Sequence, residues 1–577
     1  MNFPLPSLQR EFLTRNRHHI IFGIIFSFGF LSRLYLISNQ IIIGDEWHSF
    51  SAIAGKTYLD ILKQFNPHDN SSPILNLYLL FLANNAGLSE LTIRLPTVIS
   101  GLLLIFYIPL LIKNITNNRV YVLFSYLLVI SPSLIFYSRF FRAYSIIVFL
   151  GMLSILLFYY WLTTGRNVYI AGFFISDLII VYAHPGSLPI VFSPFISLLI
   201  IFTRCFKKEI FSKISIKVTF QQLIIVGIFL SICTAVLLIP MISSFSELRL
   251  SSSGLTVNSF IGASTLLSGT ENVFINAIFY TLFISGAVII FNELPLLAWI
   301  LATIFLLNVI TLLILRPNGI GDMHVLLRYN IIVVPIALLL VSLAIEKLMV
   351  HFSYSTIINR ITTTSIVILF LAALFALGPI PVFFNGKINN YAFHQLFYGP
   401  YKTFYWDKTN TFEKSPLYYS IKNNSKINTI IEYPFDICNL HLGMYFFQHI
   451  HEKKVIAGYV NMQLFQSYQN VEARVRSLCI DDILFGLKDK PPLKLHNNIN
   501  LSDQTAINNS GADVIILHKY LMTERIDQGG EAIPLFYESV DYLSLYFWKK
   551  YGPPLYEDKE IICFPLKSSL KDRVAQQ

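Results

Sequence analysis

The sequence predicts a polytopic α-helical membrane protein that ends in a folded α/β domain. Hydrophobic residues make up 54% of its 577 residues and charged residues only 13%, a balance far from that of a soluble domain. Apolar segments of about 18–23 residues, each long enough to cross a bilayer, recur up to about residue 383. Beyond that point the composition turns polar, with short apolar runs typical of β-strands.

The apolar segments give about eleven predicted transmembrane helices. The first has no small-residue cleavage site, so we expect a retained helix and not a signal peptide. Arg10, Arg15 and Arg17 precede it, which predicts a cytoplasmic N-terminus, because basic residues favour the cytoplasmic side. The predicted spans are residues 19–39, 93–112, 120–137, 143–162, 168–183, 186–203, 220–241, 273–291, 294–315, 329–346 and 361–383.

The charge of the connecting loops supports this orientation. Loops assigned to the cytoplasm carry thirteen basic residues, and those assigned to the outside carry seven over a greater length. One segment, TRCFKKEIFSKISIK, supplies five of the thirteen. This bias and the attraction to anionic membrane lipids explain the net charge of +10 without a nucleic-acid partner. An odd number of spans then places residues 384–577 outside.

The chain therefore divides into two predicted domains. Residues 1–383 form a transmembrane domain, whose first outer loop, 41–92, contains apolar stretches suited to helices on the membrane surface. Residues 384–577 form an exported domain, since about 190 residues suffice for one folded unit. Its strand-like runs are TIIEYPF, DVIILH and EIICFPL.

An acidic pair follows the first span. Asp45 and Glu46 stand in the sequence GDEWH, where the chain leaves the membrane on the outer side. Taken alone, the pair is best explained as a helix cap, since acidic residues favour the first turn of a helix. A carboxylate here could also serve as a general base toward a hydroxyl group arriving from outside.

Three further clusters place basic residues on the outer side. SPSLIFYSRFFRAYS carries Arg139 and Arg142, which would share one face if the segment were helical. VYAHPGSLP holds His184 in a tight turn, and GDMHVLLRYN puts Arg328 at the start of the tenth span. Such arginines either snorkel or grip phosphate oxygens, and a lone histidine in a turn is more often structural. Carboxylate, arginines and histidine together indicate chemistry on a phosphorylated lipid, and no nucleotide-binding glycine loop is present.

The order of these clusters, together with RLPTVISGLLLIFYIPLL, AHPG and RYNIIVVPIALLL, resembles the GT-C superfamily of integral-membrane glycosyltransferases. The likeness is greatest to the bacterial mannosyltransferase-like and aminoarabinose-transferase-like branch, which is related to protein O-mannosyltransferases. In the C-terminal part, IIEYPF, YFFQHIHEKKVIAGYVN, GADVIILHKYL and YGPPLYEDKEIICFPL are similar to the exported domains of such enzymes. The resemblance therefore spans nearly the whole chain.

The resemblance implies a hexosyl- or pentosyltransferase of the bacterial inner (plasma) membrane. Members of the family take the sugar from a polyprenyl phosphate. The implied reaction moves it to a hydroxyl of a lipid, glycan or protein acceptor on the outer face, with inversion. The resemblance implies no certain cofactor and leaves a divalent cation open. Phe140 stands where relatives often have Glu, which weakens the case for a metal role of that loop, and no metal ligand is assigned.

The resemblance also implies roles for particular residues. Asp45 becomes the catalytic base, with Glu46 as its neighbour. Arg142 and Arg328 match basic positions expected to meet the donor phosphate, and Arg139 is assigned with them. The remaining residues of the outer clusters predicted to contact substrate are His48, His68, Tyr144, His184 and Tyr329.

Two other classes of protein remain as alternatives. A lipid-linked glycan transporter or flippase would carry ionisable residues within its spans and paired broken helices in two repeats. Against this alternative, we find only Asp177 within a predicted span, and no internal repeat. An O-antigen polymerase or ligase would carry its key loop late in the chain. It would not carry an acidic pair after the first helix.

The orientation is directly testable. Cysteines introduced by Ser51→Cys and Ser415→Cys should react with a membrane-impermeant maleimide from the outer side, because both residues belong to segments predicted to be outside. Reaction only after the inner membrane has been opened would reverse the topology and remove the basis for an outward-facing enzyme.

Overall fold

The computed structural model describes most of the helical part of the chain and the core of its C-terminal part. Asp45, His48 and His68 lie outside the described residues. The described residues are 7–35, 37–39, 46, 49, 52–53, 56–63, 72–202, 216–240, 255–316, 320–321, 323–353, 357–381, 416–433, 451, 453–455, 511–518, 524–526, 532–534, 544–545, 547–559, 561–567 and 570.

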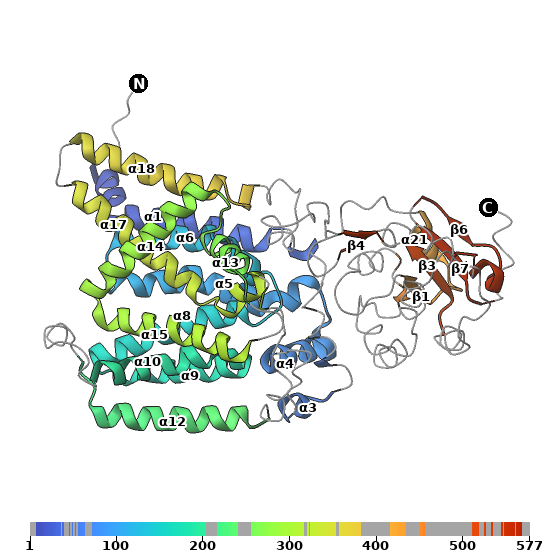
Figure 1. Cartoon of the computed structure of the whole chain (residues 1–577), viewed down its shortest axis with the longest axis horizontal. Coiled ribbons are helices and arrows are strands. Elements are labelled where there is room, and N and C mark those ends of the chain that lie inside the picture. The colour runs from blue at the N-terminus through green and yellow to red at the C-terminus, as the bar shows by residue number, and fades with distance from the viewer. Residues whose placement is uncertain are drawn as a thin grey trace. The chain divides into compact units, whose positions relative to one another are not determined.

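Each of the eleven predicted spans falls on a long helix or a helix pair (Figure 1). The segment predicted as one span at 120–137 is two helices, α6 and α7. The helices are α1 Ser7–Leu34, α5 Glu90–Lys113, α6 Asn118–Ile130, α7 Pro132–Ser138, α8 Tyr144–Thr164, α9 Asn167–Ala183, α10 Leu188–Phe202, α12 Phe220–Leu238, α14 Val273–Glu293, α15 Pro295–Leu315, α17 Val333–Ser353 and α18 Ile357–Ala376.

Seven of the described helices are long and apolar enough to cross a membrane, and the pair α6–α7, bent by 63°, makes an eighth if it counts as one span. These seven are α5, α8, Pro185–Phe202, α12, α14, α15 and α17. The other predicted spans lie on α1, on the 17-residue α9 and on α18, whose apolar part is shorter. The predicted class, a multi-pass helical membrane protein, is confirmed.

Local sequence signals set many of the helix ends. Asn117 caps α6, because its side chain accepts hydrogen bonds from two backbone N–H groups of the first turn. Thr219 begins α12 in a capping box with Gln222. Gly165 ends α8 in the left-handed region at φ 74°, a conformation that glycine adopts without steric cost.

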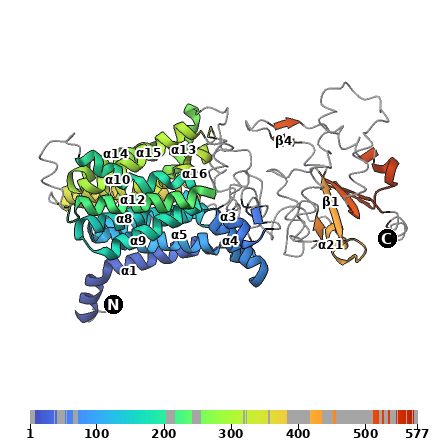
Figure 2. The same cartoon turned by 90° about the horizontal axis from the view of Figure 1, so that it is seen from below.

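The long helices lie side by side in a bundle (Figures 1 and 2), with α8 against α9, α14 against α17 and α10 against α15. Gly286 permits the second of these contacts, because a Cβ at this position would lie 1.9 Å from the carbonyl oxygen of Leu340. Helix α17 is largely buried, whereas α12 exposes isoleucine and phenylalanine side chains along much of its length. Such an apolar outer surface suits contact with lipid.

Short helices lie in the segments between the spans. Helices α3 Tyr58–Lys63 and α4 Pro73–Phe81 belong to the first long loop, and α13 Val257–Ser268 packs against α16 Met323–Tyr329. Arg328 is the penultimate residue of α16, and a three-residue turn, 330–332, separates this helix from α17. The prediction that Arg328 starts the tenth span is therefore wrong, because a separate helix carries it.

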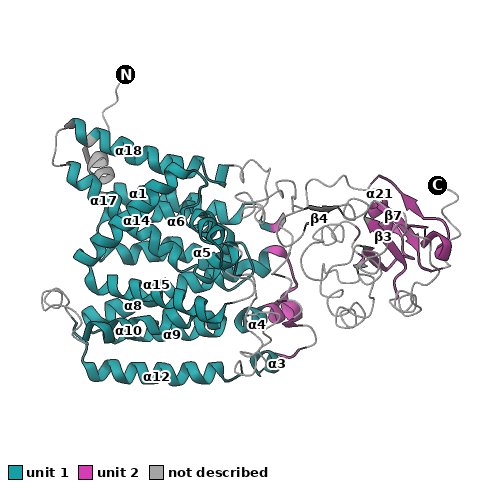
Figure 3. Cartoon of the chain, viewed as in Figure 1, with its two compact units in different colours: residues 1–37, 58–78, 91–402 teal, residues 38–57, 79–90, 403–577 magenta. Residues whose placement is uncertain are grey.

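The chain forms two compact units, coloured separately in Figure 3. The first comprises residues Met1–Ile37, Tyr58–Tyr78 and Leu91–Lys402. The second comprises Ser38–Thr57, Leu79–Glu90 and Thr403–Gln577.

The C-terminal part contains a five-stranded mixed sheet of order β2-β1-β3-β7-β6. Its three long strands are the three apolar runs expected from the sequence, and the central pair, β3 and β7, is antiparallel. β1 runs parallel to both β2 and β3, which gives the α/β character that was predicted. The elements are α21 Pro416–Asn423, β1 Thr429–Tyr433, β2 Lys454–Val455, β3 Val514–His518, β6 Tyr556–Glu557 and β7 Ile561–Pro565, and a separate pair is β4 Glu524–Ile526 with β5 Ala532–Pro534.

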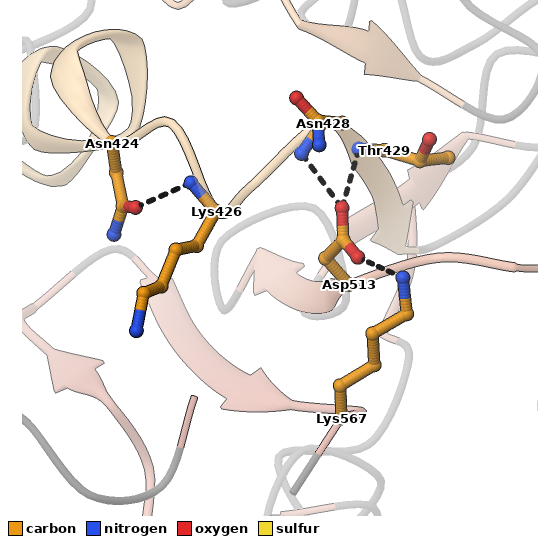
Figure 4. A network of polar contacts seen from close by, with 6 residues as sticks. All are labelled: Asn424, Lys426, Asn428, Thr429, Asp513 and Lys567. Carbon is orange, nitrogen blue, oxygen red and sulfur yellow. Dashed lines mark hydrogen bonds and ion pairs between the residues drawn. The ribbon is translucent and has the colours of Figure 1, made fainter. Parts of the chain in front are cut away.

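Asp513 connects three segments of this sheet (Figure 4). One carboxylate oxygen accepts hydrogen bonds from the backbone N–H groups of Asn428, at 2.6 Å, and Thr429, at 2.9 Å. The other accepts from Lys567, just after β7. Burial alone would raise the pKa of Asp513, but the Lys567 ammonium and the two N–H groups outweigh it, so the pKa is lowered.

Asp513→Asn should destabilise the sheet at neutral pH by roughly 1.5–3 kcal/mol, since a neutral amide loses the charge-assisted bonds. Hydrogen exchange of peptides covering β1 and β3 in the full chain measures this. The folded-state pKa is depressed, so the carboxylate stabilises the fold above the unfolded-state pKa and loses this effect as the pH falls through the folded value. The difference between wild type and variant should therefore close in acid.

Asp558→Asn is the matched control. The Asp558 side chain accepts the N–H of Ile561, and an amide oxygen preserves that bond. An equal loss of protection in β1 and β3 in both variants would show that Asp513 has no special role there.

Candidate functional site

The loops at one end of the bundle bring together five of the residues that the sequence singled out. Two come from the start of α8, one from the turn after α9 and two from α16. All lie in the first compact unit. They are Arg142, Tyr144, His184, Arg328 and Tyr329.

His184 lies at the centre of this group. It precedes a single 3-10 turn, η4 Pro185–Ser187, and its Nδ1 accepts the backbone N–H of Gly186 at 3.0 Å. Its ring centroid lies 6.0 Å from that of Tyr144 and 5.9 Å from that of Tyr329, the latter edge-on. The turn predicted from the His-Pro-Gly sequence is present, and His184 is a hydrogen-bonded residue within it.

Two arginines lie near this histidine. Arg142 is buried, with 7% of its surface exposed, whereas Arg328 is partly exposed and its guanidinium carbon lies 5.6 Å from the Tyr329 ring centroid. Burial, followed by the positive charges of Arg142 and Arg328, lowers the pKa of His184 to about 4. The ring is therefore neutral near pH 7.

Arg139 belongs to a different cluster. It ends α7, and the residues from 139 to 143 form a turn, so Arg139 and Arg142 do not share a helix face. Arg139 donates a hydrogen bond to the carbonyl oxygen of Ser32 at 3.0 Å. Burial, and then the charges of Arg94 and Arg33, lower the pKa of its guanidinium, which shows that three arginines gather here.

The sequence interpretation missed Arg33 and Arg94, although both lie inside predicted spans and an ionisable residue in a span signals a special environment. Arg33 is fully buried and donates to the carbonyl oxygens of Gly29, at 3.1 Å, and Leu128, at 3.5 Å. Gly101 gives it room, because a Cβ there would lie 3.4 Å from the Arg33 Nε and 2.3 Å from the Ser138 Cβ.

Other predicted residues are placed as follows. Glu46 is fully buried and belongs to the second compact unit. Phe140, which stands where relatives often have Glu, is buried with its ring centroid 5.0 Å from that of Phe136. Asp177 accepts a hydrogen bond from the Ser154 hydroxyl at 2.5 Å, between α9 and α8. Within the described ranges, no group of three His, Cys, Asp or Glu residues could hold a metal ion.

The His184 group, by contrast, is suited to binding an anion. Guanidinium groups bind the oxygens of phosphate or carboxylate in a planar, two-point geometry, and aromatic rings beside them exclude water. Its two arginines lie near a neutral histidine and two tyrosines at the ends of apolar helices. This combination favours a phosphate whose carrier is itself apolar.

No family model and no curated protein matches the sequence. Solved structures do match the fold. ArnT from Cupriavidus metallidurans in the apo state gives a TM-score of 0.52 at 10% identity, over 96% of this chain and 99% of that chain. The same protein bound to undecaprenyl phosphate gives 0.51 at 11% identity, over 95% and 98%. AglB from Archaeoglobus fulgidus, an archaeal oligosaccharyltransferase, gives 0.49 at 11% identity, over 89% and 70%.

The likeness to ArnT covers almost the full length of both chains. This chain therefore has the fold of ArnT, and the resemblance predicted from the order of the sequence motifs is confirmed at the level of the fold.

Proposed function

We propose that this chain is an inverting glycosyltransferase of the bacterial inner membrane. It moves a hexosyl or pentosyl group from a polyprenyl phosphate to a hydroxyl of a lipid, glycan or protein acceptor on the outer face. The observation that carries the proposal is the convergence of Arg142, Arg328 and His184 at one end of the apolar bundle. The fold supports it, because ArnT shares this fold and has been solved bound to undecaprenyl phosphate.

The donor phosphate lies between the two arginines in this proposal. A polyprenyl chain remains in the apolar phase, so its phosphate stays at the edge of the bilayer, where the ends of α8, α9 and α16 meet. Arg142 and Arg328 neutralise the phosphate and stabilise the charge that grows on its oxygen as the sugar leaves.

Asp45 acts as the general base. It accepts the proton of the acceptor hydroxyl while the hydroxyl oxygen attacks the anomeric carbon from the face opposite the phosphate. The bond between the anomeric carbon and the phosphate oxygen breaks, and its electron pair stays with the phosphate. Attack from the opposite face inverts the anomeric configuration. Glu46, the adjacent acid, orients Asp45 or the acceptor.

Arg142→Ala and Arg328→Ala should each weaken the binding of undecaprenyl phosphate by roughly 1.5–3 kcal/mol, the scale of a hydrogen bond to a charged group. Binding to the full chain in detergent can be followed by ligand-induced thermal stabilisation or by direct titration. Arg166→Ala is the control, since this exposed arginine precedes α9, at the opposite end of that helix from His184. Unchanged affinity in both site variants would reduce the two arginines to interfacial anchors.

Asp45→Asn should lower turnover by roughly a hundredfold or more and leave donor binding intact, because general-base catalysis contributes about 10²–10⁴ and an amide cannot accept the proton. Glu46→Gln should lower turnover less. Sugar transfer by purified Asp45→Asn at a rate near that of the wild type would leave the acidic pair with the role of a helix cap.

A further inference from the structure

The ring of His184 is held in one orientation. Its Nδ1 accepts the backbone N–H of Gly186, and the backbone N–H of His184 donates to the carbonyl oxygen of Ile180 at 2.9 Å. Glycine at position 186 leaves room for this ring, since a Cβ there would lie 2.7 Å from the ring Cε1 and 2.8 Å from Nδ1. The ring also contacts Tyr144 and Tyr329. Both the position and the direction of the imidazole are thus determined by the turn.

This orientation settles which nitrogen carries the proton. A neutral imidazole has one donor nitrogen and one acceptor nitrogen, and Nδ1 is the acceptor toward Gly186. The proton of the neutral ring is therefore on Nε2. Among the described residues, none accepts a hydrogen bond from this nitrogen.

Burial, and then the charges around His184, keep the ring neutral. Those that act on it are Arg142, from the loop before α8, and Arg328, from α16, both positive. The titratable rings that contact it are Tyr144, at the start of α8, and Tyr329, on α16. No described carboxylate acts on the ring to favour its protonated form.

We propose that His184 donates its Nε2–H to an oxygen of the donor phosphate, as an uncharged third ligand beside Arg142 and Arg328. This role rests on the proposed function, because it needs a phosphate between the arginines. Breaking the bond between the anomeric carbon and the phosphate oxygen leaves an electron pair on that oxygen. The hydrogen bond from His184 strengthens as this charge grows, and His184 keeps its proton throughout.

A neutral hydrogen-bond donor at this position has an advantage over a third cation. A protonated histidine between two arginines would add repulsion within the empty site and would give up its proton readily. The neutral ring supplies a directed hydrogen bond to the phosphate and adds no positive charge to the site. In this arrangement His184 stabilises the leaving phosphate directly and does not act as a general acid.

The test measures the affinity of the full chain for undecaprenyl phosphate in detergent, with undecaprenol as the phosphate-free probe. His184→Ala should lower the affinity for the phosphate about ten- to a hundredfold and leave undecaprenol binding unchanged. His184→Gln should restore much of the loss, because its side-chain amide can place an N–H near the Nε2 position. Gly186→Ala should also lower the affinity for the phosphate although His184 itself is unchanged, since the new Cβ displaces the imidazole ring.

Protonation is tested by the ratio of wild-type to His184→Gln affinity between pH 5.5 and 8. The ratio cancels the ionisation of the phosphate itself and should stay constant, because the imidazole does not titrate in this range. A ratio that rises several-fold below pH 6.5 would show a cationic histidine and overturn the proposal. This comparison uses the glutamine variant, so it stands even if the alanine variant fails to fold.

The possible outcomes distinguish a failure of the proposed function from a failure of the role of His184. If the wild type binds undecaprenyl phosphate no better than undecaprenol, the proposed function itself fails. If the wild type prefers the phosphate but His184→Ala binds it equally well, the role of His184 alone is overturned and the arginines remain its ligands.

Discussion

The candidate site depends on the break between α6 and α7. Pro132 has no N–H to continue α6, so the chain bends by 63° after Ser131 and a new seven-residue helix begins. Gly269 makes room for this corner, because a Cβ there would lie 2.8 Å from the proline Cδ. An unbroken α6 would carry the following residues on along its own axis. The bend instead buries all of α7 and turns Arg139 and Arg142 into the bundle.

The turn at residues 139–143 supplies one arginine to each of two clusters, one fully buried and one partly exposed. Arg139 meets Arg33 and Arg94 in a fully enclosed cluster, where Arg33 is bonded to main-chain carbonyls. Buried charges are costly to leave without partners, so such a cluster holds α1, α5 and α7 in one arrangement. Arg142, by contrast, lies near His184, together with the partly exposed Arg328. Both clusters therefore depend on the conformation of the same turn.

Composition and short motifs predicted the helical bundle, the strands and the histidine turn, since each depends on neighbouring residues. The three apolar runs of the tail became β1, β3 and β7, and the His-Pro-Gly sequence became a capped turn. The cluster of Arg33, Arg94 and Arg139 was not predicted, because it joins arginines from three helices far apart in sequence. Arg33 and Arg94 lie at the ends of apolar runs, where averaging over a span hides a single charge. Pro132 went unused as a sign of a break, because the apolar residues on both sides of it led us to predict one span.

The charge of the candidate site follows from its residue types. Arginine keeps its charge at any physiological pH, and His184 stays neutral because burial, followed by the charges of the two arginines, lowers its pKa to about 4. The candidate site therefore has the same charge from mildly acidic to mildly basic conditions. A pH dependence of turnover must then come from groups that change protonation during the reaction. In the proposed mechanism that group is the acidic pair, so binding and proton transfer would respond to different ionisations and can be separated experimentally.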